Sequence, residues 1–134
     1  MLNSSLRYLC RYPKPGRSNP SVSVYSADLK PYCDCKTKLL TPPKYFDGKE
    51  KIIYAVTWAN NKDVILTWEN RHQNYSQLSV CDVSNNISIC KDSLAMAEPN
   101  GWLELKQPPV FTKDGKRFAM ILPSEGNYFL NVPG

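Results

Sequence analysis

The chain has 134 residues, of which 42% are hydrophobic, 11% aromatic and 22% charged. This composition excludes an intrinsically disordered chain, and the longest apolar stretch, residues 52–59, is too short to cross a bilayer. Eleven prolines against six glycines, without a long apolar helical stripe, favour a single domain-sized body of short strands joined by turns.

The net charge of +5 comes from the first part of the sequence. Residues 1–51 hold ten Lys or Arg against four Asp or Glu, whereas residues 52–134 hold seven against eight. Basic residues that bind nucleic acid cluster on one face among stacking aromatics, but these are separated by prolines, cysteines and turns. We therefore expect a solvated or inter-domain surface and no nucleic-acid partner.

Several features are typical of secreted proteins. Residues 1–10 contain neither an apolar h-region nor a cleavage site, so they are not a signal peptide. Three N-glycosylation sequons nevertheless begin at Asn3, Asn74 and Asn86, and there are five cysteines. Together these features indicate a piece of a longer extracellular chain. The alternative is a cytosolic protein with free thiols.

The first predicted strands follow a proline-rich connection. Residues 12–20 hold three prolines, which lack a backbone donor, so this segment is expected to connect elements rather than pair. Residues 21–27 alternate valine with polar side chains, the pattern of a half-buried strand. A further short strand is expected over residues 36–41, ended by Pro42 and Pro43.

The central part of the sequence predicts an antiparallel hairpin. Residues 52–58 form a strand with two largely apolar faces, as expected for a strand covered on both sides. Strict alternation places these residues on one face: Ile52, Tyr54, Val56 and Trp58. A turn follows at residues 60–63. The return strand, residues 64–68, carries Val64, Leu66 and Trp68 on one face.

The remaining strands follow at a spacing of roughly ten residues. A third strand is expected over residues 77–83, and a fourth returns from Ile87. Asp114-Gly115 lies between β-rich runs and predicts another hairpin, because glycine adopts positive φ without steric cost. Residues 118–122 form its return strand and residues 127–132 begin one more. The sequence therefore predicts an all-β fold of about eight antiparallel strands, with sandwich, barrel and propeller all open.

Cys81 and Cys90 are expected to face each other across a hairpin. If Asn85-Asn86 forms a two-residue loop, counting outward pairs Cys81 with Cys90 at a non-hydrogen-bonded position, with Cα atoms about 4.5 Å apart. This spacing permits a disulfide worth roughly 2–3 kcal/mol. The alternative is two buried thiols.

The other cysteines do not predict a metal site. Cys33-Asp34-Cys35 has no second cysteine pair or histidine cluster to complete four zinc ligands, so neither metal nor cofactor is expected. Either residue can pair with Cys10 or with a cysteine outside this chain, and the spacing leaves these pairings open.

The sequence offers no catalytic centre. It contains no G-x-S-x-G nucleophile elbow and no phosphate-binding glycine loop. Its single histidine, His72, precedes a sequon and fits a solvent-facing turn better than a catalytic role. We therefore assign no catalytic residue to this chain.

An ordered set of short motifs points to a known family. It comprises Tyr12-Pro13-Lys14-Pro15-Gly16, Asn19-Pro20-Ser21-Val22, Val56-Thr57-Trp58, Trp68 with Arg71, Gln73-Asn74-Tyr75-Ser76, Cys81-Asp82, Gly101-Trp102, and Pro109-Val110-Phe111 with Asp114-Gly115. From Arg11 to Leu130 this set resembles the dipeptidyl peptidase IV branch of the prolyl oligopeptidase family of serine peptidases. The likeness falls on an interior portion of the family's N-terminal β-propeller.

The resemblance implies an eight-bladed propeller of four-stranded antiparallel blades. Residues 11–134 would supply one to one-and-a-half blades, after an N-terminal extension, residues 1–10, of uncertain nature. The family's catalytic triad lies in a C-terminal α/β-hydrolase domain and does not map onto this chain, nor does its substrate-binding Glu-Glu pair. Matching positions imply a glycan at Asn74 and a disulfide between Cys81 and Cys90.

The resemblance also implies a parent protein and its partners. The parent would be a secreted or membrane-anchored glycoprotein, commonly a homodimer, that releases Xaa-Pro or Xaa-Ala dipeptides from peptide N-termini. The alternative parent is a relative without the nucleophile that binds membrane proteins. This chain would contact the hydrolase domain and the remaining blades, and by itself we expect it to be poorly soluble or loosely packed.

The sequence departs from the family pattern in two places. The stretch from Gly101 to Phe111 is about two residues shorter than expected and holds no aromatic residue between Trp102 and Phe111, so substrate contact there is in doubt. Residues 28–49, including Cys33 and Cys35, also fit poorly.

Overall fold

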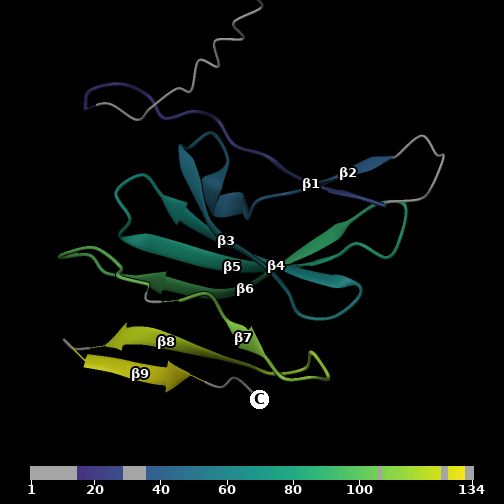
Figure 1. Cartoon of the computed structure of the whole chain (residues 1–134). Coiled ribbons are helices and arrows are strands. Elements are labelled where there is room, and N and C mark those ends of the chain that lie inside the picture. The colour runs from purple at the N-terminus through teal and green to yellow at the C-terminus, as the bar shows by residue number, and fades with distance from the viewer. Residues whose placement is uncertain (1–14, 29–35, 106, 125–126, 132–134) are drawn as a thin grey trace, which may run out of the picture.

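The computed structural model describes residues 15–28, 36–105, 107–124 and 127–131 (Figure 1). Within these ranges the chain forms nine strands and one short 3₁₀ helix, η1, so the predicted all-β class is confirmed. The elements are β1 (Val24–Ala27), β2 (Thr37–Leu40), η1 (Lys44–Phe46), β3 (Lys51–Trp58), β4 (Asp63–Asn70), β5 (Tyr75–Asp82), β6 (Ile89–Ala97), β7 (Val110–Phe111), β8 (Phe118–Ser124) and β9 (Asn127–Asn131).

The strands form three antiparallel sheets in which sequence neighbours pair. The orders are β1-β2, β3-β4-β5-β6 and β7-β8-β9. Figure 1 shows the four-stranded sheet in the middle, with the β1-β2 pair on one side and the β7-β9 sheet on the other. A four-stranded antiparallel meander is the repeating unit of a β-propeller. The arrangement therefore contains one complete unit between two partial ones.

One face of the four-stranded sheet packs against the N-terminal elements. Val64, Leu66 and Trp68 share this face, as predicted, and all three are buried. Leu40 of β2 and Phe46 of η1 cover them, with Val22 and Val24 at the margin. The 3₁₀ turn therefore delivers an aromatic side chain to the first core.

The opposite face packs against the C-terminal elements. Ile65 and Leu78 point to this side and contact Leu105 and Met120, which are also buried. Phe111 and Phe118 join the same cluster, and their ring centroids lie 5.4 Å apart. Because β4 is covered on both faces, it is buried along most of its length.

A β-bulge in β3 overturns the predicted arrangement of its side chains. Ile53 pairs with Trp68 and Ala55 pairs with Thr67, so Tyr54 is an extra residue in the ladder. The bulge shifts the alternation by one position. Val56 therefore shares its face with Ile53, whereas Tyr54 packs into the cluster on the opposite face.

The turn between β5 and β6 also differs from the prediction. The ladder ends where Asp82 pairs with Ile89, so residues 83–88 form a six-residue loop rather than two-residue turn at Asn85-Asn86. Val83 leaves the ladder because its N–H donates to the carbonyl of Lys62, 2.8 Å away, and its side chain is buried. The register predicted for Cys81 and Cys90 is nevertheless the one observed.

The hairpin predicted at Asp114-Gly115 is present between β7 and β8. Phe111 pairs with Phe118, and Gly115 adopts φ +67° in the connecting loop. A Cβ at Gly115 would lie 2.8 Å from the carbonyl oxygen of Ala59, so glycine is required here for space as well as for conformation.

The connection from β6 to β7 lies against the turn between β4 and β5. The N–H of Glu98 donates to the carbonyl of Asn74 at 2.9 Å, and that of Leu103 donates to the carbonyl of Gln73 at 2.6 Å. The Tyr54 hydroxyl donates to the carbonyl of Leu105 at 2.7 Å. These bonds hold the connection across the end of the four-stranded sheet.

Some predicted features lie outside the described residues. They are the extension at residues 1–10, the sequon at Asn3, and Cys10, Cys33 and Cys35.

Candidate functional site

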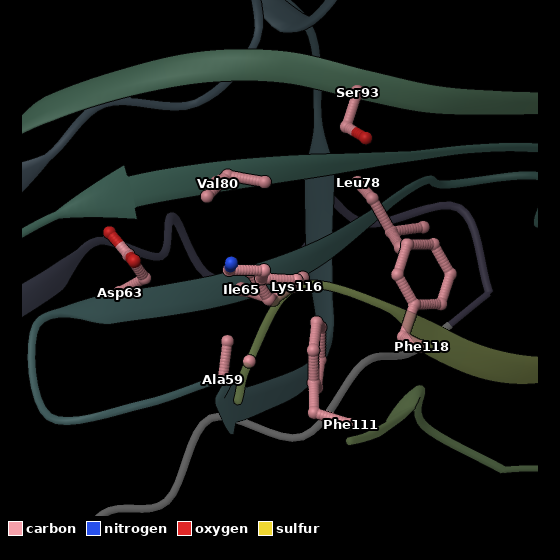
Figure 2. Close-up of a pocket in the computed structure, with 10 residues that line it drawn as sticks. Ala59, Asp63, Ile65, Leu78, Val80, Ser93, Phe111, Lys116 and Phe118 are labelled. Carbon is pink, nitrogen blue, oxygen red and sulfur yellow. The ribbon is translucent and has the colours of Figure 1, made fainter. Parts of the chain in front are cut away.

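A small cleft separates the four-stranded sheet from the hairpin of β7 and β8. Its volume is about 260 Å³. Figure 2 shows Ile65, Leu78 and Val80 on the sheet side, with Phe111 and Phe118 on the hairpin side. The cleft exists because β4 and β5 place alternate apolar residues on this face while the β7-β8 hairpin covers only part of it.

The polar groups of the cleft do not form a reaction centre. Asp63 lies at one end, and its carboxylate accepts a hydrogen bond from the side-chain amide of Asn60 at 2.7 Å. Lys116 and Ser93 also line the cleft, without a histidine to activate the serine. The arrangement is therefore suited to packing an apolar group and offers no nucleophile and base pair.

A buried carboxyl group lies on the same face of the sheet, near its other end. Glu69 is only 2% exposed, and its carboxyl accepts a hydrogen bond from the Gln73 side chain at 3.3 Å. Burial raises the pKa of Glu69, and the Gln73 hydrogen bond offsets part of this rise. Burial also raises the pKa of Tyr54, with a contribution from the charge of Glu69.

Two hydroxyl groups on this face have no hydrogen-bond partner in the described structure. They belong to Thr67 and Ser76, and both side chains are fully buried. Ser76 lies directly opposite Glu69 in the β4-β5 ladder. Sequence reasoning missed this polar group; the signal was the alternation of Ile65, Thr67 and Glu69, which places a carboxyl on an otherwise apolar face.

His72 lies in the exposed turn between β4 and β5, as predicted. It borders a shallow depression with Tyr45, Lys49 and Arg71. Arg71 forms an ion pair with Glu50 and donates to the carbonyl of Arg17. The Arg71 hydrogen bond lowers the pKa of Glu50. Through its bond to the Arg17 carbonyl, Arg71 also ties the N-terminal segment to the sheet.

Cys81 and Cys90 form a disulfide in the structure. Their Cα atoms are 4.0 Å apart, and they face each other across β5 and β6. Cys81 is fully buried in the first core, so the bond joins β6 to the packed centre of the sheet.

The structure describes two of the three sequon asparagines. Asn74 ends the turn before β5, where its Oδ1 accepts from the Asn70 side chain at 2.7 Å and its N–H donates back to Asn70 Oδ1 at 3.1 Å. Asn86 is exposed in the loop between β5 and β6. In the second sequon the Ser88 hydroxyl donates to the carbonyl of Leu39 at 2.6 Å.

The described residues contain no group of three His, Cys, Asp or Glu side chains able to hold a metal ion. None of their helices has the length and apolar character needed to cross a membrane.

Comparison with known proteins places the chain in a family. Residues 4–131 match the model of the dipeptidyl peptidase IV N-terminal region. The chain is 36% identical over 112 residues to inactive dipeptidyl peptidase 10 of Rattus norvegicus, covering 84% of this chain and 14% of the relative. It is 32% identical over 127 residues to dipeptidyl peptidase 4 of Felis catus, covering 87% and 16%.

A venom protein gives a third comparison. The chain is 35% identical over 103 residues to venom dipeptidyl peptidase 4 of Apis mellifera, covering 75% of this chain and 12% of that protein. The chain thus spans only about one-seventh of the length of the relatives it matches. From the family match and the antiparallel four-stranded meander, we conclude that this chain belongs to the dipeptidyl peptidase IV family and is a segment of its N-terminal β-propeller region.

Proposed function

We propose that residues 11–134 are part of an eight-bladed propeller in a serine exopeptidase that releases Xaa-Pro or Xaa-Ala dipeptides from peptide N-termini. The observation that carries this proposal is the family match over residues 4–131, joined to a complete four-stranded unit between two partial ones. In this proposal the segment helps to enclose and select peptide substrates, and the reaction takes place in another domain.

The residues of the segment support a non-catalytic role. Its single histidine is exposed in a turn, and the cleft beside β7 and β8 offers Ser93 without a histidine. A serine peptidase requires a nucleophile, a base and an oxyanion site in one constellation. The catalytic residues are therefore proposed to lie in an α/β-hydrolase domain of the parent chain.

The open edge of the four-stranded sheet supports contacts with further blades. Val56 and Trp58 of β3 are 51% and 58% exposed, although they alternate on a strand like core residues. Burial of such side chains in a larger body is favourable at about 25 cal/mol per Å². We propose that the remaining blades and the hydrolase domain cover this edge in a parent that forms a homodimer.

An extracellular location fits the covalent chemistry of the segment. The Cys81–Cys90 disulfide is a bond that oxidising compartments preserve. We propose glycans at Asn3, Asn74 and Asn86. At Asn74 the hydrogen bonds to Asn70 engage Oδ1 and the backbone, leaving the amide nitrogen outside this pair. Ser76, the third residue of this sequon, is fully buried in the folded chain. Transfer of the glycan to Asn74 would therefore precede the folding of β5.

A second candidate parent is a family member without peptidase activity that binds membrane proteins. The observation behind it is that the rat relative, at 36% identity, carries the word inactive in its name, while the cat and honeybee relatives at similar identity do not. Sequence identity within this segment therefore does not distinguish an active parent from an inactive one, and the distinction depends on residues elsewhere in the parent.

Activity of the complete protein tests the proposal. The open reading frame would be cloned to both ends, expressed in a secretory host and assayed with a Gly-Pro chromogenic amide. We expect hydrolysis that disappears when the serine of the nucleophile elbow is changed to alanine. A folded full-length protein without that serine and without activity would overturn the peptidase proposal in favour of the binding partner. Hydrolysis by the purified 134-residue chain would overturn the non-catalytic role of the segment.

A further inference from the structure

The turn that follows β6 presents the single Asn-Gly step of the sequence to solvent. Asn100 and Gly101 are both exposed, and they lie in the connection between the four-stranded sheet and β7. Neither residue lines the cleft between the four-stranded sheet and the β7-β8 hairpin, and the proposed function makes no use of them.

We propose that Asn100 is a site of spontaneous deamidation. The backbone nitrogen of Gly101 attacks the side-chain carbonyl carbon of Asn100, and a new C–N bond closes a cyclic imide. The bond from that carbon to the side-chain nitrogen breaks, and ammonia leaves with the proton of the Gly101 nitrogen. Water then opens the imide at either carbonyl, giving aspartate or isoaspartate. No oxidant, metal or enzyme takes part.

The local structure favours this reaction at Gly101. The attacking nitrogen bears only a weak hydrogen bond, since its distance to the Glu98 carbonyl oxygen is 3.4 Å. Glycine has no Cβ to obstruct the approach of its nitrogen to the preceding side chain, and it permits a wide range of backbone angles. Asparagine is already among the thermolabile residues of proteins.

Asn61 provides an internal comparison. It too is exposed in a turn, between β3 and β4, but Lys62 follows it. The Lys62 nitrogen donates to Asn60 Oδ1 at 2.9 Å, a normal hydrogen bond that engages the atom which would have to attack. The same chemistry is therefore disfavoured at Asn61 by both the side chain and the hydrogen bond.

The modification would alter a connection that is fixed at both ends. Glu98 is held to Asn74 and Leu103 to Gln73 by backbone hydrogen bonds of 2.9 Å and 2.6 Å. Isoaspartate inserts an extra carbon into the main chain between these two points and adds a negative charge near the Glu98 carboxylate. A short loop held at two points cannot absorb the extra length without weakening one of the bonds. The buried Leu103 side chain depends on the second of them.

Peptide mass spectrometry of the folded chain tests the proposal. The protein would be incubated at neutral pH and digested at intervals. We expect the peptide that contains Asn100 to gain about 1 Da, appearing as separate aspartate and isoaspartate forms, while the Asn61 peptide keeps its mass. Equal conversion of the two peptides, or conversion of Asn100 only in urea, would overturn the proposal.

Two variants separate the causes. Gly101→Ala is tolerated in space, because its Cβ would meet only the Glu98 Cγ at 3.5 Å, so we expect a folded protein with most of the mass gain lost. Unchanged conversion in this variant would contradict the role given to Gly101. Freshly prepared Asn100→Asp, measured before its own Asp-Gly step can cyclise, carries the charge without the added carbon. Hydrogen exchange at the Leu103 amide should therefore increase in the isoaspartate form and much less in Asn100→Asp; equal exchange in both would contradict the lengthening argument.

Discussion

β3 and β4 are paired strands of equal length whose burial differs sharply. β4 is buried at six consecutive positions, residues 64–69, whereas every residue of β3 is partly or largely exposed. Trp68 on β4 is fully buried, while Trp58 on β3 is 58% exposed. Both strands are rich in apolar residues, so composition does not explain the contrast.

The difference comes from position in the sheet. β4 has a hydrogen-bonded neighbour on each side and a packed layer on each face, but among the described strands β3 pairs with β4 alone. A long apolar edge strand exposes unpaired backbone groups and is a liability in an isolated protein. The contrast therefore indicates that β3 requires further structure, whereas β4 belongs to a core that is already complete.

Tryptophan replacement gives the largest expected contrast. Trp68→Ala should cost roughly 3–5 kcal/mol of unfolding free energy, because it opens a cavity in the first core and leaves the Ser79 hydroxyl without its indole donor. Trp58→Ala should cost under about 1 kcal/mol. Denaturant unfolding of both variants measures the difference, and similar losses would show that β3 is as well packed as β4.

The disulfide joins β5 and β6, the two strands of the sheet that lie farthest from β3. Replacing both Cys81 and Cys90 by serine should lower the unfolding free energy by roughly 2–3 kcal/mol. The loss is moderate because the loop that the disulfide closes is short. Unfolding of the double variant and of the unmodified chain gives the difference. Peptide mapping without reduction supplies the control. Recovery of both cysteines as alkylated thiols from the unmodified chain would contradict the bond.

Two glycines with the same φ separate the effect of backbone conformation from the effect of space: Gly48 precedes β3, and Gly115 lies against the turn that follows β3. Gly48 and Gly115 both have φ +67°, but only a Cβ at Gly115 would meet other residues, the Ala59 carbonyl and the Asn60 side chain. Gly48→Ala should cost about 1–2 kcal/mol for the left-handed backbone alone. Gly115→Ala should cost at least about 1 kcal/mol more, because its Cβ overlaps the Ala59 carbonyl. Equal unfolding free energies would indicate that the hairpin does not press on Ala59.

The smallest expected effect concerns the carboxyl that β4 buries. Since burial raises the pKa of Glu69, the folded state holds its proton more tightly than the unfolded state. This stabilisation is complete below the unfolded pKa and is lost as the pH rises through the folded pKa. Glu69→Gln removes the titration and should be the more stable protein near neutral pH, where the buried Glu69 carboxyl is under pressure to ionise.

The difference in unfolding free energy between the unmodified chain and Glu69→Gln should depend on pH. Once the pH lies below the ordinary pKa of glutamate, both side chains are neutral in the folded and the unfolded states, so the two unfolding free energies should then change in parallel with pH. A constant difference at all pH values would show that Glu69 is solvated in the folded protein.

Most strands could be predicted from the sequence because alternation depends only on neighbouring residues. The strands around Val64 and Phe118 follow this rule, and so does the turn at Gly115. The bulge at Tyr54 could not be predicted in this way. Both faces of β3 are apolar, so a shift of one residue does not disturb the pattern of apolar residues. The loop after Asp82 escaped the rule because the Val83 amide bonds to Lys62, which is distant in sequence.

The polar features were less predictable than the strands. The absence of a nucleophile elbow can be read directly from the sequence, and the opposed position of Cys81 and Cys90 follows from counting along a hairpin. The burial of Glu69 depends on the strands that flank it and on the layer that covers their common face. Such tertiary cover leaves no local signal beyond a carboxyl group on an apolar face.

Sedimentation velocity of the purified 134-residue chain tests the central claim most directly. An apolar edge that requires further blades should drive self-association, so the weight-average sedimentation coefficient should rise with concentration, and Trp58→Lys should suppress the rise. A concentration-independent monomer in the unmodified chain, unaffected by Trp58→Lys, would contradict the claim that β3 is built to be covered.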